Sequence, residues 1–454
     1  MNAISTARIR QSTWRLYAPA SALLLWACLW LNVNTGFWNI QAPHSLDEWQ
    51  LLGRAILPFA VLPLAGVLVL SRRKLDLPGL SPSQLLMIYG LLAAIASVVS
   101  PQPTWSLYWS MTFLATIATA WTFATTRTPV SSARQMLQVT WAVMFVVSVI
   151  IAYTVRGAVF GSAPSAYGVY ADLNGLSRSS GVARWAAIPG LVCVVKAYHT
   201  RRPALIAFFL AAAGVAFFII YRMQSRGAVF GSAAALLFAL VTSSRLRRYA
   251  LPFLVFAMVV LTVLQSPGML SDRVSEYLRR GQTEEVFFSM TGRTALYENG
   301  VAAFWDAPLL GRGQWADRLV SGGHVHNSYL QALLNAGILG GIPYVASWIA
   351  GWVLFFRLQK KRHLLRPDDR VALLEAGTVM MFFTVRSVPE TTTASFAVDL
   401  LAMAAVYVYL EALTISMARR SRSARIRLRA STPRKRFCSQ TAGRSVLVAG
   451  ASRE

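Results

Sequence analysis

Long apolar stretches recur through the whole sequence, and this recurrence constrains the fold more than any other feature. A helix of about 20 mostly apolar residues crosses the hydrocarbon core of a bilayer. Apolar residues form 55% of the chain and charged residues 14%, whereas a soluble domain has about 45–50% and about 25%. Twelve stretches approach the spanning length, at about 16–33, 51–70, 82–100, 105–124, 136–154, 183–199, 204–221, 227–243, 249–265, 328–356, 371–388 and 396–417. We therefore expect an all-α, polytopic membrane protein with about 12 transmembrane helices, and not a soluble enzyme, a disulfide-stabilised secreted domain or a disordered protein.

Basic residues orient these predicted spans. The formal net charge is +26, which on a soluble chain would indicate nucleic-acid binding. Here the basic residues concentrate in every second connection, at 72–74, 127–134, 196–202, 245–248 and 357–370. The positive-inside rule gives cytoplasmic loops this distribution. We therefore expect both termini in the cytoplasm, an uncleaved first span and no nucleic-acid partner.

The predicted topology divides the chain into four parts. Residues 1–265 form spans one to nine, 266–327 an outside loop, 328–417 spans ten to twelve, and 418–454 a basic cytoplasmic tail. The loop is nearly neutral, and its residues 294–305 have a helical pattern, so we expect a partly helical segment folded against the membrane face. The tail is rich in Arg and Ser and is predicted to lie disordered on anionic membrane lipids.

Several arginines lie on the outside in this topology, against the positive-inside bias. A guanidinium near the hydrocarbon edge requires an acidic partner or an anionic ligand, and its forked donors suit phosphate. Arg226 opens a predicted helix, whose positive end adds to its field. For any one of these arginines, contact with lipid headgroups is the alternative. The set, whose size favours a bound phosphate, is Arg156, Arg178, Arg184, Arg222, Arg226 and Arg386.

A histidine string joins the outside loop to the tenth span. It reads His324-Val325-His326-Asn327-Ser328, and Asn327 or Ser328 is suited to cap the following helix. His326, near water yet shielded, is placed for proton transfer. A helix cap or an interfacial anchor is the alternative role for this histidine. His324 completes a His-x-His pair, but the sequence offers no clear third ligand, so we predict no metal site.

Glycine and proline punctuate the same region. The tenth predicted helix is long, so we expect it either to tilt or to break, and a break would fall at Gly337, Gly340, Gly341 or Pro343. Upstream, residues 306–313 read Asp-Ala-Pro-Leu-Leu-Gly-Arg-Gly, which is typical of a tight turn. Taken singly, each of these strings is compatible with loop punctuation alone.

In their order along the chain, these motifs resemble the O-antigen ligase/polymerase superfamily. The set comprises Ser-Arg-Gly-Ala at 225–228, Gly-Arg at 292–293, the string at 306–313, and His-Asn at 326–327 followed after nine residues by Gly-x-x-Gly. It covers about residues 170–390, and the large loop between spans nine and ten looks like that of the ligases. The resemblance implies a multi-pass protein of the bacterial inner membrane with an active site that faces the periplasm.

The resemblance also implies roles for individual residues. Arg226 and Arg293 match family arginines that hold the diphosphate of a lipid-linked glycan, and His326 matches the histidine at the acceptor. The implied donor is a glycan on undecaprenyl diphosphate, and the implied acceptor is lipid A-core. Further substrate contacts are expected from Arg222, Arg184, Arg178, Asn327, Arg386 and His324.

The implied reaction is an inverting glycosyl transfer. Its oxocarbenium-like transition state places negative charge on the leaving diphosphate, and two fixed arginines stabilise that charge without a metal or a cofactor. The outside face carries no Asp-x-Asp string of the kind that metal-dependent glycosyltransferases use. His326 is the expected base for the acceptor hydroxyl, and Glu298, Asp306 and Glu390 are reserve candidates.

Three alternatives remain at the level of the sequence. A polymerase of the same superfamily would use a second lipid-linked glycan as acceptor, and the histidine string with the long loop favours a ligase over it. A protein acceptor is a further possibility, although such enzymes usually carry a larger outside segment at the C-terminus. A transporter would show two similar halves, which the sequence lacks, and its key residues would line a central pore.

Overall fold

The structure is a computed structural model, and it describes residues 18–33, 49–71, 80–154, 156, 179–223, 225–243 and 293–431. All regular secondary structure in these residues is helical. Eleven of the twelve predicted spans are helices, and most of their ends lie within about four residues of the expected bounds. The fifth helix begins earlier than predicted, at Pro129 and not at 136. The last helix continues to Ser431, so the prediction of a disordered tail from 418 is wrong for its first residues, where Arg and Ala residues are compatible with a helix. The ninth, at 249–265, lies outside the described residues.

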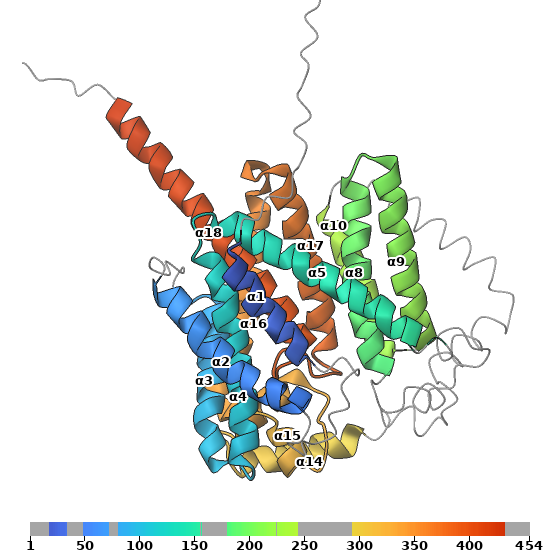
Figure 1. Cartoon of the computed structure of the whole chain (residues 1–454), viewed down its shortest axis with the longest axis vertical. Coiled ribbons are helices and arrows are strands. Elements are labelled where there is room, and N and C mark those ends of the chain that lie inside the picture. Colours follow the sequence, from blue (N-terminus) through green and yellow to red (C-terminus); the bar gives the residue numbers. More distant parts are fainter. Residues whose placement is uncertain are drawn as a thin grey trace, which may run out of the picture. The chain divides into compact units, whose positions relative to one another are not determined.

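The helices are shown in Figure 1 and are named by the labels used there. They are α1 (Ala20–Asn32), α2 (Trp49–Ser71), α3 (Pro82–Ala96), α4 (Pro103–Ala124), α5 (Pro129–Thr154), α8 (Ser179–His199), α9 (Pro203–Met223), α10 (Arg226–Thr242), α14 (Arg293–Trp305), α15 (Ala316–Val320), α16 (Ser328–Lys360), α17 (Pro367–Arg386) and α18 (Val398–Ser431), with 3-10 turns η1 (Ser97–Val99) and η2 (Arg362–Leu364).

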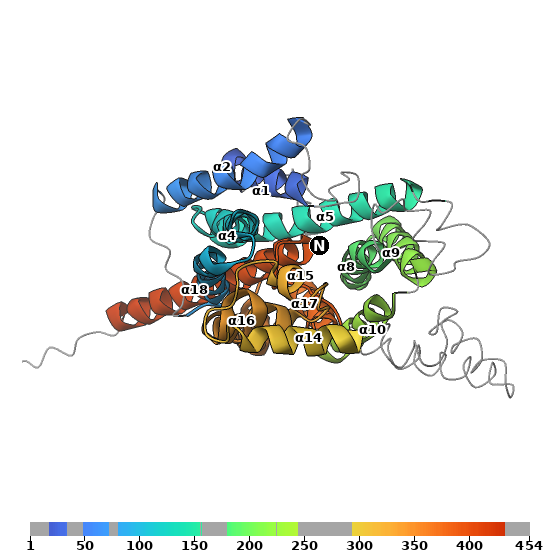
Figure 2. The ribbon, with the colours of Figure 1, turned by 90° about the horizontal axis from the view of Figure 1, so that it is seen from below.

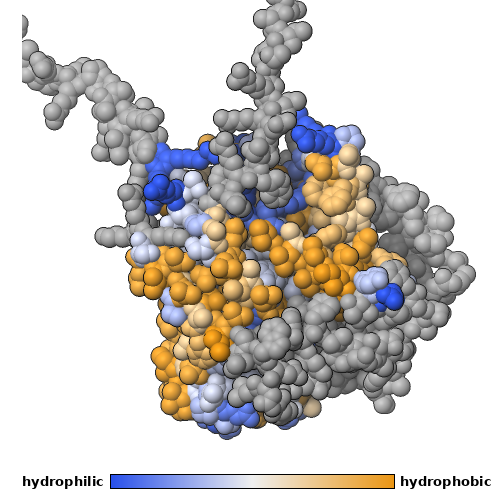
Figure 3. Space-filling view, in the orientation of Figure 1, coloured by the Kyte–Doolittle hydropathy of each residue, from blue (hydrophilic) through white to orange (hydrophobic). Residues whose placement is uncertain are grey.

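Length and hydropathy identify six helical stretches among the described residues that are able to cross a membrane. One comprises α3 and η1, and the others lie within α5, α8, α9, α16 and α18. Helices α1 and α10, and part of α2, are apolar but shorter. Large apolar side chains are exposed on the outer faces of these helices, including Leu70 and Phe208. On the face in Figure 3, apolar residues form a broad surface with hydrophilic groups near its edges, as expected of helices that face lipid. The full count of twelve spans stays a prediction.

Helix α18 forms the centre of the bundle over its first turns. Its residues from Val398 to Leu410 are almost completely buried. The apolar sequence of this segment is uninterrupted apart from Asp399, so the helix has no polar face to present to water. Glu411, one of its buried acids, accepts hydrogen bonds from the backbone and the hydroxyl of Ser83 at the start of α3.

The expected break in the long helix α16 is present and lies at its first predicted position. Ala336 and Gly337 have non-helical backbone angles, and Gly337 has a φ of 58°, a conformation that favours glycine. The string at 306–313 fills the break, because Ile338 N–H donates to Pro308 O (2.8 Å) and Gly313 N–H donates to Asn335 O (2.8 Å). The loop thus satisfies backbone groups that the interrupted helix leaves open.

Residues 293–327 pack onto the first turns of α16. Ala303, Ala316, Val325 and Leu334 form a small buried apolar cluster, with Phe304, Val320 and Leu330 packed against it. Figure 2 shows α14 and α15 beside α16. The helix predicted at 294–305 is present as α14, and the described part of the expected loop is therefore folded against the bundle. Residues 266–292 lie outside the described residues.

The helices run antiparallel in a way that separates two ends of the bundle. Val195, Ala239 and Leu374 form one buried cluster, near the basic turns at 200–202 and 361–366 that connect α8 to α9 and α16 to α17. The cluster lies near the ends of α8 and α10 and near the start of α17. The start of α8, the start of α10 and the end of α17 therefore lie at the opposite end of the bundle. The predicted outside arginines Arg184, Arg226 and Arg386 are therefore at the end away from these basic turns.

Candidate functional site

His326 lies immediately before α16 and contacts an acid from a distant segment. Its Nδ1 is 3.0 Å from Oε2 of Glu390, which belongs to the connection between α17 and α18. The backbone of His326 has a φ of 48°, an uncommon left-handed conformation for a residue with a side chain. Asn327 caps α16 as predicted, with Oδ1 accepting from Tyr329 N and Leu330 N. The cap fixes the direction in which the chain leaves His326.

Arg293 opens α14 and binds the same carboxylate. Its Nη2 is 2.8 Å from Oε1 of Glu390, and its Nη1 donates to Pro389 O. Glu390 therefore bridges Arg293 and His326, with one oxygen to each. Tyr297, one turn along α14, donates its hydroxyl to the backbone oxygen of His326 at 3.3 Å. This gives His326 a second tie to α14.

Arg226 and Gly227 bring the start of α10 to this carboxylate. Arg226 lies near enough to Arg293 for the two like charges to interact. A Cβ atom on Gly227 would lie 3.7 Å from Cγ of Glu390 and 4.0 Å from Nε of Arg386. The predicted catalytic residues Arg226, Arg293 and His326 are therefore close together, although they lie on three different elements and as much as 100 positions apart in the sequence.

Asp399 forms a second ion cluster beside the first. Its Oδ2 is 2.9 Å from Nη1 of Arg184 and 3.6 Å from Nη1 of Arg386. The side chain of Asp399 is fully buried and that of Arg386 is 2% exposed. Within the described residues, Nε and Nη1 of Arg386 have no hydrogen-bond partner. The two predicted arginines are thus held by one acid that the sequence reading did not select.

The charge state of Glu390 follows from the groups around it, which are His326, Arg386 and Arg293. Burial by itself raises the pKa of a carboxyl group. The hydrogen bond with His326 and the charges of Arg386 and Arg293 outweigh it, and together they hold the pKa of Glu390 well below its usual range. Glu390 is therefore an ionised counter-charge and a poor proton acceptor at neutral pH. His326 contacts Glu390 through Nδ1, so Nε2 is the ring nitrogen on the side away from this carboxylate.

The other predicted site residues have different placements. Arg222 is half-buried in the last turn of α9, and Arg178 lies outside the described residues. The amide of Asn327 donates to Val388 O at 3.0 Å, so this residue also ties α16 to the connection that carries Glu390. His324 contacts Asp317, with its Nδ1 2.6 Å from Oδ2. Direct contact of any of these residues with substrate stays a prediction.

Among the reserve acids, only Glu390 joins the cluster in the described residues. Glu298 and Asp306 are exposed on and after α14. Sequence reasoning missed Asp399 and Asp317, which are both fully buried. A signal existed for Asp399, because an acid inside a long apolar stretch requires a cationic partner. Nothing local distinguishes Asp317 from the other acids of its loop.

The described residues contain no group of three or more His, Cys, Asp or Glu side chains arranged to hold a metal ion. The Nδ1 atoms of the His-x-His pair contact separate carboxylates, Asp317 and Glu390. The site contains a set of guanidinium groups beside His326, which contacts its carboxylate through Nδ1 and not through Nε2. This arrangement is suited to binding an anion next to a proton acceptor.

Residues 211–345 match a family model described as O-antigen ligase. The match confirms the resemblance to the O-antigen ligase/polymerase superfamily that the motifs indicated. The matched segment contains Arg226, Arg293 and His326, whereas Glu390 and Asp399 lie beyond it. No curated protein sequence matches the chain.

Proposed function

We propose that the protein transfers a glycan from undecaprenyl diphosphate to a hydroxyl group of lipid A-core at the periplasmic face of the bacterial inner membrane. The match of residues 211–345 to the O-antigen ligase family model supports this proposal. The observation that supports this most is the grouping of three residues: Arg226 lies beside Arg293, and Arg293 and His326 both contact Glu390. A phosphate-binding pair beside a proton acceptor is the minimum that such a transfer requires.

Charge balance supports a diphosphate donor. The described residues of the two joined clusters carry four guanidinium groups, on Arg184, Arg226, Arg293 and Arg386, and two carboxylates, on Glu390 and Asp399. This composition has a surplus of two positive charges. The diphosphate of a lipid-linked glycan is a diester and carries about two negative charges at neutral pH. The donor would neutralise the surplus.

The proposed reaction begins at the acceptor. Its hydroxyl oxygen attacks the anomeric carbon while the bond from that carbon to the diphosphate oxygen breaks, so the configuration inverts. The hydroxyl proton passes to Nε2 of His326, whose other ring nitrogen contacts ionised Glu390. Negative charge grows on the leaving diphosphate, where Arg226 and Arg293 stabilise it. The imidazolium that forms is stabilised by Glu390.

The membrane side of the reaction follows from the two ends of the bundle. The site residues lie at the end away from the basic turns at 200–202 and 361–366. If those turns face the cytoplasm, as basic loops do, the site faces the periplasm and both termini lie inside. The convergence of the site at helix ends and connections also favours an enzyme over a transporter, whose site would lie near the bilayer midplane.

The test is reconstituted transfer by purified protein in EDTA. One reaction contains undecaprenyl-diphosphate glycan with lipid A-core, and a matched reaction lacks lipid A-core. We expect glycan on lipid A-core, lost in Arg226→Ala and His326→Ala and retained in Arg201→Ala, an exposed arginine of the opposite end. Longer glycan on the polyprenyl carrier in both reactions would instead identify a polymerase. Normal product from Arg226→Ala would contradict the role of this residue as a diphosphate clamp.

A further inference from the structure

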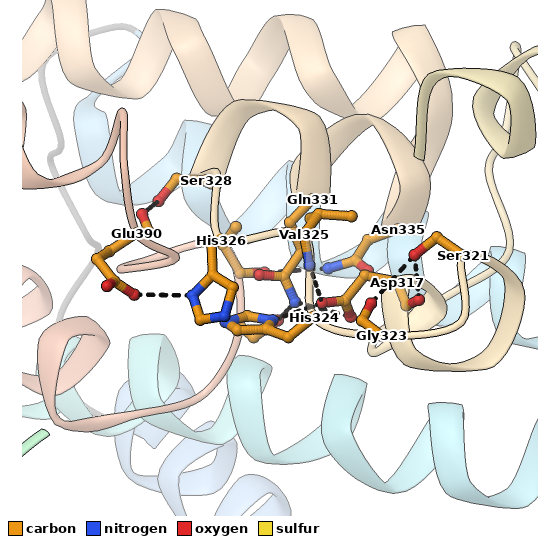
Figure 4. A network of polar contacts seen from close by, with 12 residues as sticks. Asp317, Ser321, Gly323, His324, Val325, His326, Ser328, Gln331, Asn335 and Glu390 are labelled. Carbon is orange, nitrogen blue, oxygen red and sulfur yellow. Dashed lines mark hydrogen bonds and ion pairs between the residues drawn. The ribbon is translucent and has the colours of Figure 1, made fainter. Parts of the chain in front are cut away.

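A second carboxylate–histidine pair lies directly beside the first. Oδ2 of Asp317, in α15, is 2.6 Å from Nδ1 of His324, as Figure 4 shows. The ring of His324 in turn contacts the ring of His326, with 4.4 Å between the centroids and an angle of 60° between the planes. Asp317 therefore reaches the proposed base through one intervening imidazole.

The carboxylate of Asp317 is held from several directions. Its Oδ1 is 3.2 Å from Nε2 of Gln331 on α16, and its Oδ2 is 3.4 Å from the backbone nitrogen of Val325. The side chain is fully buried. A buried carboxylate with this many donors keeps a fixed position, so the ring that it binds is also fixed.

Backbone conformation points to the same segment. Among the described residues, Trp315 (φ 68°) and His326 (φ 48°) are the two non-glycine residues with positive φ, and they flank the Asp317–His324 pair. Such conformations persist only when the surroundings hold them. Trp315 is held between the ring of Trp109, stacked at 4.7 Å, and the guanidinium of Arg318, 3.6 Å from its centroid. His326 is held by its ring contact with His324 and by Glu390.

The Asp317–His324 pair carries a net negative charge beside His326. Burial raises the pKa of Asp317, but the hydrogen bond and charge of His324 outweigh burial and leave the pKa of this acid lowered. Burial lowers the pKa of His324, and the contact with Asp317 only partly offsets it. The pair is therefore a neutral imidazole that donates from Nδ1 to an ionised carboxylate. The charged groups that act on His324 are Asp317 and Arg318 of α15 and the neighbouring His326. His326 contacts Glu390 and the hydroxyl of Tyr297, and Arg293 of α14 and Arg386 of α17 act on Glu390.

We propose that Asp317 is a positioning residue for the transfer reaction and acts through His324 on His326. The inference rests on the function proposed above. Asp317 fixes the tautomer and the place of His324, which holds the ring of His326 in its left-handed turn. The negative charge of the pair also stabilises the imidazolium that forms on His326 when it takes the proton of the acceptor hydroxyl.

The experiment compares Asp317→Asn with Ser321→Ala in the reconstituted reaction. Ser321 donates its hydroxyl to the backbone oxygens of Asp317 and Gly323, so its replacement loosens the same turn and leaves the carboxylate in place. For Asp317→Asn we expect kcat to fall about tenfold or more, the donor KM to stay within about twofold because the arginines are untouched, and the acidic limb of the pH–rate profile to move to lower pH. Ser321→Ala should keep the wild-type profile.

The outcomes separate this inference from the proposed function. Wild-type kcat and an unmoved pH profile in Asp317→Asn would overturn it, and equal losses in both variants without a pH change would reduce Asp317 to a structural role. If Asp317→Asn does not fold, His324→Gln replaces it, and an unchanged kcat there overturns the proposal. NMR titration of labelled histidines does not require turnover. If wild type shows no transfer, the proposed function is overturned, and the titration still tests the positioning role. A His326 titration that is the same in Asp317→Asn and wild type would overturn that role as well.

Discussion

Glu390 binds Arg293 through one carboxylate oxygen at 2.8 Å and His326 through the other at 3.0 Å. This single acid joins the start of α14, the turn before α16 and the connection after α17. Its position decides how the two proposed catalytic residues face each other. The predictions that follow concern this contact, the break in α16 and the neighbouring ion cluster.

Replacing Glu390 by Gln should nearly abolish transfer. The amide keeps the shape of the side chain but removes the charge that holds Arg293 and stabilises protonated His326. Breaking a buried ion pair by removing one partner costs about 3–5 kcal/mol of stability, so a lowered melting temperature in detergent should accompany the loss of rate. Glu298→Gln, an exposed acid on α14, is the matched control. Full activity of Glu390→Gln would contradict the bridging role.

The lowered pKa of Glu390 gives the stability of the protein a defined dependence on pH. A carboxyl whose folded-state pKa lies below the value of about 4.3 in an unfolded chain stabilises the fold above that value. The stabilisation is lost as pH falls toward the folded-state pKa. The contribution of Glu390 itself to the difference in melting temperature between wild type and Glu390→Gln should therefore be fully present above about pH 5 and should shrink as the pH falls below about 4. If the difference in melting temperature instead grew as the pH fell below about 4, the pKa of Glu390 would not be lowered by folding.

Gly337→Ala should destabilise the protein strongly. A Cβ at Gly337 would lie 2.2 Å from the backbone oxygen of Leu309, and the positive φ is unfavourable for alanine. The loop at 306–313 would have to move out of the break in α16. We expect this movement to displace the first turns of α16 and the turn at His326 that precedes them. The control is Gly214→Ala in α9, where a Cβ meets nothing within 4 Å and a helix gains about 0.5–1 kcal/mol. Thermal unfolding of both variants would test the contrast, and equal melting temperatures would refute it.

Asp399→Asn should also destabilise the bundle, because Arg184 and Arg386 would lose the carboxylate between them. Asp399 is fully buried, and the expected cost is about 3–5 kcal/mol. The same change at Asp368, whose side chain is 79% exposed beside Arg134, should be nearly neutral. Thermal unfolding of both variants in one detergent is the measurement. Similar melting temperatures would mean that the Asp399 cluster contributes little.

Most of the described helices and many of their ends were predictable because their causes are local. Apolar runs specify the spans, since any helix in lipid must satisfy its own backbone and expose apolar side chains. Asn327 at the start of α16 and Gly337 at its break act through their own backbone and nearest turns. The motif order was also sufficient to select Arg226, Arg293 and His326 and to indicate the family.

The partners of these residues were decided only by the tertiary structure. Glu390 is 97 positions from Arg293 and 64 from His326, and Asp399 is 215 from Arg184. A sequence shows that a buried charge needs a counter-charge, but the choice among several acids depends on which helix ends meet in space. The role of residues 306–313 has the same origin: they read as a turn, and only the packing of that turn against α16 shows that their backbone completes a broken helix. The sequence therefore determined the membrane class, most of the helices and the choice of proposed reactive residues, whereas long-range packing determined which acid holds each of them.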